Sequence, residues 1–381
     1  MEYKALKEIA KITMGQSPDS SSYNEDGDGM PFFQGNADFG EIYPNERIWC
    51  NDPKKTAEPG DILISVRAPI GALNYAKDRC CIGRGLAAIT IDDEAERNYV
   101  FHLLKAKNSD LNNQGTGSTF KAIGKAVLED VQVPQISREE QQKCMDIMDL
   151  LESIIRERRA QLSSLDELIK ARFVEMFGDP NIEFKSESHK FKEYVFDMTK
   201  GPFGSDMKKD LYVPKGEDTY KVYIQINAIQ GNQDLGDYYI SKEYFDQKIS
   251  RFEVHPGDYI ITCDGTLGKH LKLNENMERG VISPSLLRLT LDESKMTREY
   301  FEYMWDMYML LLMKKEARNA CLIHLPSAKV IGEVDVPVAP FELQKNFSAF
   351  VEQVDKSKVA VQKSLDETRK LFDSLMQEYF G

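Results

Sequence analysis

Side chains able to bind a charged ligand gather in polar loops of this sequence, with lysines on both sides. Lys105, Lys107 and Lys121 flank or border the polar loop 112–120. Within that loop stand the hydrogen-bonding residues Asn113, Gln114, Thr116, Ser118 and Thr119. A Gly-Thr-Ser backbone presents N–H groups to phosphates, and Asn and Gln side chains read base edges. The loop therefore predicts contacts with nucleic acid.

The second half of the chain carries a comparable set of cations and polar residues. Its candidates for DNA contact are Lys200, Ser205, Lys208, Lys209, Lys269, His270, Lys314, Lys315, Arg318, Asn319 and His324. Between predicted strands, Arg67 and Arg84 of the first half stand where the second half has Asp264 and Pro284. A solvated charged face is the ordinary interpretation of any one such cluster. Two clusters at matching positions with different residues instead fit two readers of different base sequences.

No motif for catalysis or metal binding accompanies these loops. The segment GTLGKH at 265–270 lacks the spacing and the Ser/Thr of a phosphate-binding loop, and neither GxGxxG after a strand nor GxSxG occurs. The five histidines are scattered without metal-ligand spacing. Asp61 and Asp258 each follow a glycine, and we interpret both as turn residues that open a strand. The sequence therefore predicts no catalytic residues and no metal site.

Composition restricts the class of protein. The chain has 381 residues, of which 41% are hydrophobic, enough for two or three ordinary domains. Its net charge of −13 argues against holding nucleic acid by bulk charge alone, because phosphate attraction dominates nonspecific binding. Six cysteines without CxxC spacing and a polar, charged start favour a reduced, cytoplasmic protein. The longest apolar run, Met307 to Met313, is too short for a membrane span, which needs about 20 residues.

The sequence contains an internal duplication, which is the first feature to look for in a chain of this length. PGDILIS at 59–65 returns as PGDYIIT at 256–262, an offset of 197 residues. FQGNA at 33–37 resembles IQINA at 224–228. The ending EMFG at 175–178 returns as EYFG at the end of the chain, at an offset of 203. Because the matches keep their order, each half is one copy of the same unit with insertions.

Each copy ends in a heptad pattern, which predicts a long helix at 136–178 and another at 338–381. The first seam is Cys144, Met148, Leu151, Ile155, Arg158, Leu162, Leu165, Ile169, Arg172 and Met176. The second seam is Phe347, Val351, Val354, Lys358, Val361, Leu365, Thr368, Phe372, Leu375 and Tyr379. Two such helices in one chain favour an antiparallel pair, each roughly 60 Å long. The polar seam residues, Arg158, Arg172, Lys358 and Thr368, are expected to face solvent or another protein.

Two globular parts precede these helices, at 1–135 and at 182–335. Strands punctuated by Gly and Pro are predicted at 60–66, 72–76, 79–82 and 86–91, and in the second part at 221–226, 259–263, 270–273 and 285–291. A helix follows in each part, at 94–107 and at 297–318. The predicted fold class is therefore α+β, with two domains of mixed short strands and helices. An antiparallel coiled coil with pseudo-twofold symmetry is expected to separate them.

This layout resembles the specificity subunits of type I restriction–modification systems. The resemblance is carried by GDILIS with GDYIIT, by the run 115–141 with its counterpart 323–344, and by the helix endings MFGD and YFG. It implies that 1–135 and 182–335 are target-recognition domains at opposite ends of the coiled coil. Each would read one half of a split double-stranded DNA site, and the helices would set the unread gap. A rod of roughly 60 Å spans about 18 base pairs.

The resemblance also implies partners and locates the cofactors on them. Two methyltransferase subunits, which bind S-adenosylmethionine, dock on such a subunit, and two restriction subunits with ATP- and Mg-dependent activity join some complexes. The subunit itself would hold no cofactor, perform no catalysis and contact no membrane. Two other interpretations stay open. One is an enzyme such as a fused methyltransferase, which the missing motifs disfavour, and the other is a coiled-coil scaffold that does not read DNA.

Overall fold

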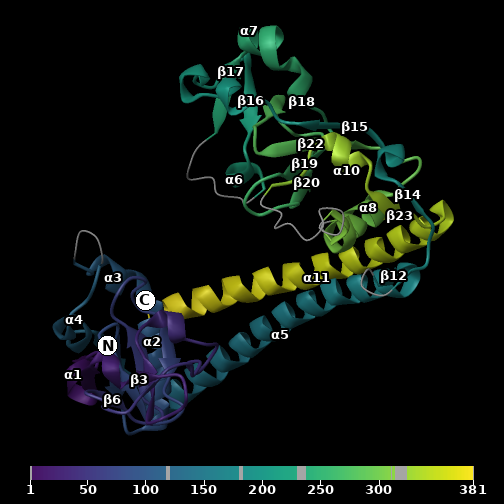
Figure 1. Ribbon diagram of the computed structural model, residues 1–381. Coiled ribbons are helices and arrows are strands. Elements are labelled where there is room, and N and C mark those ends of the chain that lie inside the picture. Colours follow the sequence, from purple (N-terminus) through teal and green to yellow (C-terminus); the bar gives the residue numbers. More distant parts are fainter. Residues whose placement is uncertain are drawn as a thin grey trace. The chain divides into compact units, whose positions relative to one another are not determined.

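The computed structural model describes residues 2–116, 121–179, 183–229, 237–309, 311–313 and 324–380. The chain folds into two compact units. The first unit comprises Met1–Gln161 with Val361–Gly381, and the second comprises Leu162–Ala360. Both boundaries fall inside the long helices α5 (Arg138–Phe177) and α11 (Phe341–Phe380) (Figure 1). Each unit therefore contains one globular part and half of each helix.

The described residues of the first unit form two larger sheets and one two-stranded sheet. One sheet has the order β2-β10-β7-β8, formed by β2 (Lys11–Met14), β10 (Leu86–Thr90), β7 (Ile62–Ser65) and β8 (Leu73–Tyr75), all antiparallel. The other has the order β3-β5-β4-β9-β6, formed by β3 (Tyr23–Asn24), β5 (Trp49–Cys50), β4 (Met30–Phe33), β9 (Cys80–Ile82) and β6 (Thr56–Ala57). In that sheet β4 runs parallel to β9. The remaining elements are β1 (Glu2–Ala5) paired with β11 (Gln132–Gln135), and helices α1 (Leu6–Ile9), α2 (Glu94–Ala106), α3 (Asn108–Asn113) and α4 (Lys125–Glu129).

The second unit repeats this arrangement. Its first sheet has the order β15-β22-β19-β20, formed by β15 (Val195–Lys200), β22 (Leu286–Leu291), β19 (Tyr259–Thr262) and β20 (His270–Lys272). Its second has the order β17-β16-β21-β18, formed by β17 (Tyr238–Ser241), β16 (Thr219–Tyr223), β21 (Gly280–Ile282) and β18 (Glu253–Val254), with β16 parallel to β21. The other described elements include β14 (Ser188–Lys190) paired with β23 (Asp335–Pro337), β12 (Gly178–Asp179) paired with β13 (Glu183–Phe184), α6 (Gln225–Ala228), α7 (Lys242–Tyr244), α8 (Arg298–Met304), the π-helical turn η9 (Trp305–Met309) and α10 (Ala328–Gly332). The sequence duplication is thus a duplication of topology.

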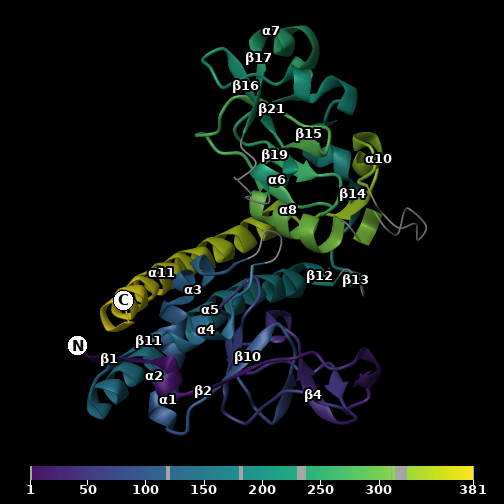
Figure 2. The same ribbon diagram turned by 90° about the vertical axis from the view of Figure 1, so that its left-hand side faces the viewer.

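Each central sheet is covered on both faces. In β7, Ile62 and Ile64 pack against α2, whereas Leu63 packs against residues of the second sheet. Figure 2 labels strands of both sheets, β2 and β10 of the first and β4 of the second. Successive side chains of a strand point to opposite faces, so a strand covered on both sides is apolar at every position. The same alternation occurs in β19, where Ile261 faces α8 and Ile260 faces β16 and β21. The unbroken apolar runs in the sequence therefore mark the middle layer of each unit.

A Gly-Asp turn opens the central strand of each unit. Gly60 and Gly257 have φ angles of +87° and +93°, a conformation that glycine adopts without strain. The Asp61 carboxylate accepts a hydrogen bond from the Glu58 backbone at 2.9 Å, and Asp258 accepts one from His255 at 2.8 Å. Burial raises the pKa of Asp61, although the hydrogen bond from Glu58 acts in the opposite direction. The interpretation of both aspartates as turn residues is confirmed.

The two long helices lie side by side within each unit (Figure 1), which confirms the predicted helix pair. In the first unit, Met148 of α5 and Met376 of α11 belong to one apolar cluster. In the second unit, the rings of Phe173 and Phe347 lie 5.2 Å apart, and Lys358 pairs with Asp166 at 2.6 Å. Residue numbers rise along α5 as they fall along α11, so the pair is antiparallel.

The polar seam positions correct one expectation. Lys358 was expected to face solvent or another protein, but its ammonium group forms the ion pair with Asp166 across the helix pair. The Arg172 guanidinium lies over the Phe350 ring at 5.8 Å from its centre. Long cationic side chains can lay their aliphatic stems along an apolar seam and keep the charge at its margin. Both residues therefore contact the facing helix.

Three predicted elements differ from the structure. The strand expected at 221–226 ends at Tyr223, where its pairing with β21 ends, and Gln225 and Ile226 belong to α6. The loop expected at 112–120 begins inside α3. The helix expected at 297–318 contains the π-helical turn η9, and its last residues lie outside the described part of the chain. Among the described residues, no helix is both long and apolar enough to cross a membrane.

Candidate nucleic-acid interface

The same backbone frame holds the loop after β7 in the first unit and after β19 in the second. The Ser65 hydroxyl donates to the Pro69 carbonyl at 2.7 Å and accepts from the Ala72 N–H at 2.9 Å. In the second unit the Thr262 hydroxyl donates to the Thr266 carbonyl and accepts from the Lys269 N–H at 3.0 Å. A hydroxyl at the strand end therefore makes the same two hydrogen bonds in both loops, although the backbones between them differ, with a cis Ala68–Pro69 bond in the first.

In the first unit this loop meets the ends of β4 and β9, and we call the set Gln34, Asn36, Arg67, Arg84, Thr116 and Lys121 the first edge. Arg67 and Arg84 line a cavity of about 250 Å³ together with Gln34 and Asn36. Arg67 forms an isolated bridge with Ala122, and Ala122 forms another with Thr116. The Lys121 carbonyl accepts a hydrogen bond from the Ala68 N–H at 3.1 Å. The structure thus brings together four of the residues predicted to contact DNA.

The cations of the first edge are available to a ligand. Arg67 and Arg84 are exposed, and neither guanidinium group forms an ion pair with any described residue. An arginine fork beside the amides of Gln34 and Asn36 matches the donor and acceptor groups of base edges. Sequence reasoning missed these two amides. The sequence feature that indicates them is the repeat of FQGNA as IQINA, in which Gln34 corresponds to Gln225.

In the second unit we call Lys200, Gln225, Asp264 and His324 the second edge. Asp264 occupies the position of Arg67, because it forms the corresponding isolated bridge, with His324. The His324 Nδ1 atom lies 2.6 Å from the Asp264 carboxylate. Lys200 donates to the Leu325 carbonyl at 3.4 Å, and the Gln225 amide lies beside Gly265. Burial raises the pKa of the neighbouring Cys263 thiol to about 11, so this sulfur stays protonated and uncharged at neutral pH.

An aromatic side chain near the second edge was also missed. Gly201 packs so closely on Ser283 and Pro284 that a larger residue would collide with them. Two residues later, Phe203 is 77% exposed. A bare phenyl ring at this place can stack on a base or contact a thymine methyl group. Its sequence signal was an aromatic residue inside the glycine-rich segment that we singled out for its lysines.

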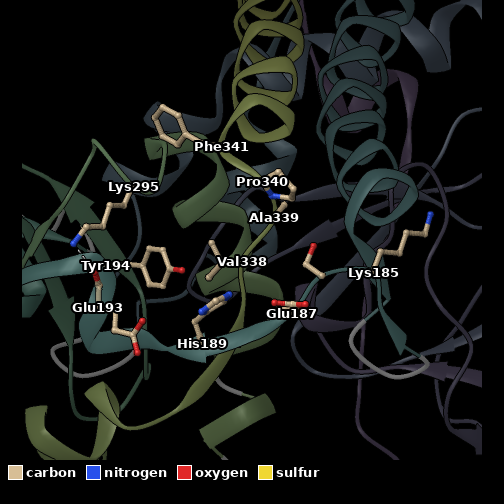
Figure 3. Close-up of a pocket in the computed structure, with 11 residues that line it drawn as sticks. Lys185, Glu187, His189, Glu193, Tyr194, Lys295, Val338, Ala339, Pro340 and Phe341 are labelled. Atoms are coloured by element: carbon tan, nitrogen blue, oxygen red, sulfur yellow. Dashed lines mark hydrogen bonds between the residues drawn. The ribbon is translucent and has the colours of Figure 1, made fainter.

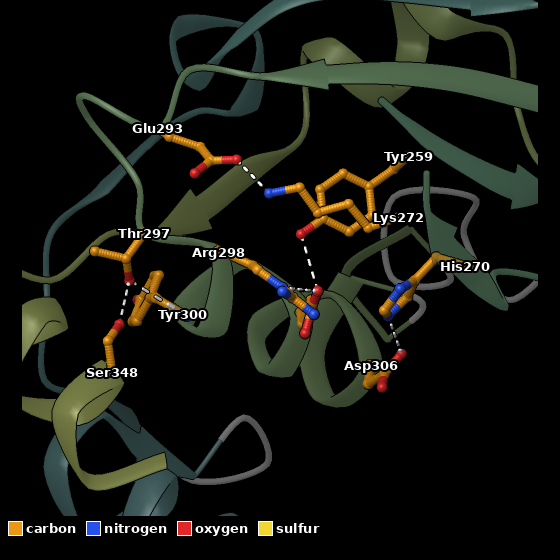
Figure 4. Close-up of polar contacts among 10 residues, drawn as sticks. Tyr259, His270, Lys272, Glu293, Thr297, Arg298, Tyr300, Asp306 and Ser348 are labelled. Atoms are coloured by element: carbon orange, nitrogen blue, oxygen red, sulfur yellow. Dashed lines mark hydrogen bonds and ion pairs between the residues drawn. The ribbon is translucent and has the colours of Figure 1, made fainter. Parts of the chain in front are cut away.

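Two of the predicted residues have structural partners elsewhere in their units. Lys105 pairs with Glu152 of α5 and lies over the Phe372 ring of α11 at 5.4 Å from its centre. His270 lies 3.1 Å from the Asp306 carboxylate (Figure 4), and its side chain is only 14% exposed. The Lys105 contacts connect α2 with both long helices, so its ammonium group is already paired within the unit. The His270 contact joins β20 to η9.

The other predicted residues are spread more widely. Lys107 and Gln114 line a cavity of about 280 Å³ beside Phe380, and Asn113 ends α3. Ser205 lies in the short helical turn η4 (Gly204–Asp206), Lys208 and Lys209 are exposed shortly after it, and Lys269 is exposed before β20. Ser118, Thr119, Lys314, Lys315, Arg318 and Asn319 lie outside the described residues. The DNA contact of all these residues stays a prediction.

Larger cavities have mixed charges. One of about 660 Å³ in the second unit is lined by Lys185, Glu187, His189, Glu193 and Lys295, and Figure 3 shows the two lysines on opposite sides of it. Another of about 810 Å³ in the first unit is lined by Lys105, Asp149, Glu152, Arg156, Arg159, Arg369 and Asp373, among others. Carboxylates in both cavities oppose a polyanion such as DNA. The described part of the chain contains no group of three or more His, Cys, Asp or Glu residues able to hold a metal ion.

A family model matches the first part of the chain. Residues 1–164 match the family model of the type I restriction modification DNA specificity domain. The match covers the first globular part and the beginning of α5, and it ends before the second globular part.

Individual relatives indicate more specifically which class of protein this chain resembles. The chain is 43% identical over 161 residues to a Methanocaldococcus jannaschii protein assigned as the MjaX type I restriction enzyme specificity subunit, covering 42% of this chain and 38% of that protein. It is 26% identical over 240 residues to the MjaIX specificity subunit of the same organism, covering 60% and 54%. The matches thus span less than two thirds of both relatives. The chain is related to type I restriction–modification specificity subunits.

A solved structure matches across the whole chain. The S subunit of a type I restriction–modification system from M. genitalium aligns with a TM-score of 0.53 at 15% identity, covering 100% of this chain and 96% of that one. At this identity the likeness concerns the fold. The α+β fold class with its pair of long helices is therefore confirmed.

Proposed function

We propose that the chain is the DNA sequence-specificity subunit of a type I restriction–modification complex. Each globular part reads one half of a bipartite double-stranded DNA site, and the pair of long helices sets the length of the unread gap. The observation that supports this most is the duplication of one topology with different side chains at the two edges. A repeated frame with exchanged surface residues is what recognition of two different half-sites requires.

The proposal assigns the chemistry to other subunits. Two methyltransferase subunits bind this chain and supply S-adenosylmethionine, and restriction subunits supply the ATP- and Mg-dependent steps. The net charge of −13 supports this division, because an acidic chain gains DNA affinity from cationic partners that surround the duplex. The chain itself orients the complex on DNA and catalyses no reaction.

Footprinting of the chain assembled with its methyltransferase subunits tests this function. We expect protection of a split sequence with an unprotected specificity gap, and genome-wide methylation at the same motif only in cells that carry the gene. A scaffold without DNA reading would leave no protected split sequence. Binding of S-adenosylmethionine by this chain alone would favour an enzyme instead.

The helix pair offers a second test. Four residues inserted into both helices, after Gln161 and after Gln362, lengthen the pair by roughly 6 Å, or about two base pairs. The preferred gap should grow accordingly, with weaker binding because the two half-sites also rotate around the duplex. The matched control inserts four residues in one helix only, which shifts the apolar seams out of register. An unchanged gap with both insertions would contradict a spacing role for the helices.

A further inference from the structure

The two edges present different chemistry from the same place in the fold. Strand β7 is buried at every position, as is β19, and both strands end at the hydroxyl residue that fixes the following loop. After one more buried residue, Val66 or Cys263, the first residue to leave the core is Arg67 in one unit and Asp264 in the other. The same strand end thus presents a cation in one unit and an anion in the other, although the backbone that follows differs, with a cis Ala68–Pro69 bond in the first unit and Gly265 at a φ of +66° in the second.

Backbone hydrogen bonds establish that these two positions correspond. The Val66 N–H donates to the Gly85 carbonyl at 2.9 Å, and the Cys263 N–H donates to the Ser285 carbonyl at 2.8 Å. The Ile123 N–H donates to Val66, and the Leu325 N–H donates to Cys263. The residue that follows Val66 or Cys263 therefore stands at the same place between two segments in both units, and its side chain is a guanidinium in one and a carboxylate in the other.

Neither side chain is needed to stabilise the fold at this place. Arg67 is exposed, and its guanidinium group has no ion-pair partner in the described part of the chain. Asp264 has a side chain 42% exposed, and His324, its partner, is 68% exposed. A surface pair of this kind contributes at most about 1 kcal/mol to stability. Selection for stability does not explain why one copy has a guanidinium and the other a carboxylate.

Contacts with the edges of DNA bases do explain why this position has a guanidinium in one unit and a carboxylate in the other. A guanidinium group donates two hydrogen bonds to the O6 and N7 atoms of guanine, and a carboxylate accepts one from the N4 amino group of cytosine. The Asp264 carboxylate has two oxygens, and His324 contacts Oδ1, which leaves Oδ2 for a base. Phosphates attract Arg67 but repel Asp264, so a shared role in binding the DNA backbone does not fit both residues.

We propose that the residue two positions after the end of β7 and β19 determines specificity in each half-site: Arg67 selects guanine and Asp264 selects cytosine. This inference rests on the proposed function, and it assigns the base preference to one corresponding position in each unit. Gln34 and Arg84 border Arg67, and Gln225 borders the loop of Asp264, so neighbouring positions refine the choice.

Conservative substitutions distinguish recognition of a base by hydrogen bonds from simple attraction or repulsion by charge. Arg67→Lys keeps the positive charge but loses the planar fork, and Asp264→Asn keeps the size but replaces one acceptor with a donor. The controls are Arg79→Lys, at the other end of β9 and paired with Glu58 at 3.0 Å, and Glu293→Gln, whose side chain pairs with Lys272. The full chain, assembled with its methyltransferase subunits, is used to select binders from a library of randomised DNA duplexes.

We expect Arg67→Lys to reduce the preference for one guanine about 10-fold in one half-site, and Asp264→Asn to reduce the preference for one cytosine similarly in the other. The unaltered half-site in each variant shows that the protein is folded and bound, and both controls should retain the wild-type motif. If both edge variants select the wild-type motif, or if both variants change the same half-site, the inference is wrong. The proposed function is still supported in either case, because the selected motif is bipartite. No split motif from the wild-type complex overturns the function itself and the inference with it.

Discussion

The two globular parts differ in the residues that contact the long helices, as well as in the residues of the two edges. In the first unit, Met145, Met148 and Met376 pack beside the ring contact of Tyr99 in α2 with Phe380 in α11, whose centres lie 5.2 Å apart. In the second, the corresponding contact consists of aromatic rings, with Phe173 within 5.5 Å of Tyr300 and 5.2 Å of Phe347. Both contacts are buried and apolar, so different side chains meet one requirement for apolar volume. The comparison teaches that the shared topology requires a certain side-chain volume in the core but places few requirements on the side chains of the two edges.

Exchange of residues 1–135 for the same part of a related subunit is the strongest test of this comparison. Because the edge residues of each unit are carried by its own loops, we expect a complete change of one half-site and none in the other. Methylation mapping of cells that express the chimera measures both halves together. Altered recognition in both halves would mean that the units do not read independently.

Truncation of the aromatic contact should cause the largest loss of stability. Phe173 is fully buried, and Phe173→Ala is expected to cost about 3–5 kcal/mol of unfolding free energy. Met148→Ala, at the matching contact of the first unit, should cost about 2–5 kcal/mol. Hydrogen exchange in β22 and in β10 reports each unit separately. The exposed Leu168→Ala serves as control, with a change within about 0.5 kcal/mol.

The two Gly-Asp turns can be compared directly, because each has the same hydrogen bond to its aspartate. Asp61→Ala and Asp258→Ala each leave a backbone N–H without its acceptor in a buried turn, which costs about 1–3 kcal/mol. Urea denaturation of the two variants measures the loss. Similar values are expected, because the turns have the same geometry. A large effect for one aspartate alone would show that the second copy of the turn no longer serves the same role.

The smallest expected effect concerns the ion pair across the helices. Lys358 and Asp166 are 30% and 50% exposed, so their coupling should be at most about 1 kcal/mol and should weaken with added salt. A double-mutant cycle with Lys358→Ala and Asp166→Ala measures it. Arg156→Ala, in the first unit, is the control, since Arg156 and Glu41 are more exposed and 3.6 Å apart. A coupling well above that limit would mean that the pair is part of the helix register.

Sequence reasoning succeeded where a signal was local or repeated. The heptad spacing predicted α5 and α11 to within a few residues, since 3.6 residues per turn forces apolar positions onto one face. It failed for Gln225 and Ile226, because the end of a strand depends on where its partner β21 ends. It also grouped Lys105 with the DNA-binding residues, although Glu152, distant in sequence, lies beside it in the fold.

By itself, the sequence determined the number of units, their α+β class and the two long helices, because duplication and periodicity are properties of the chain. Only the tertiary structure decided which cations are free, as Arg67 is, and which are paired, as Lys358 is. It also showed that Arg67 and Asp264, which the sequence repeat aligns, form corresponding bridges in the two units. The physical reason is that charge pairing and cavity lining depend on contacts between segments far apart in sequence, which no local pattern records.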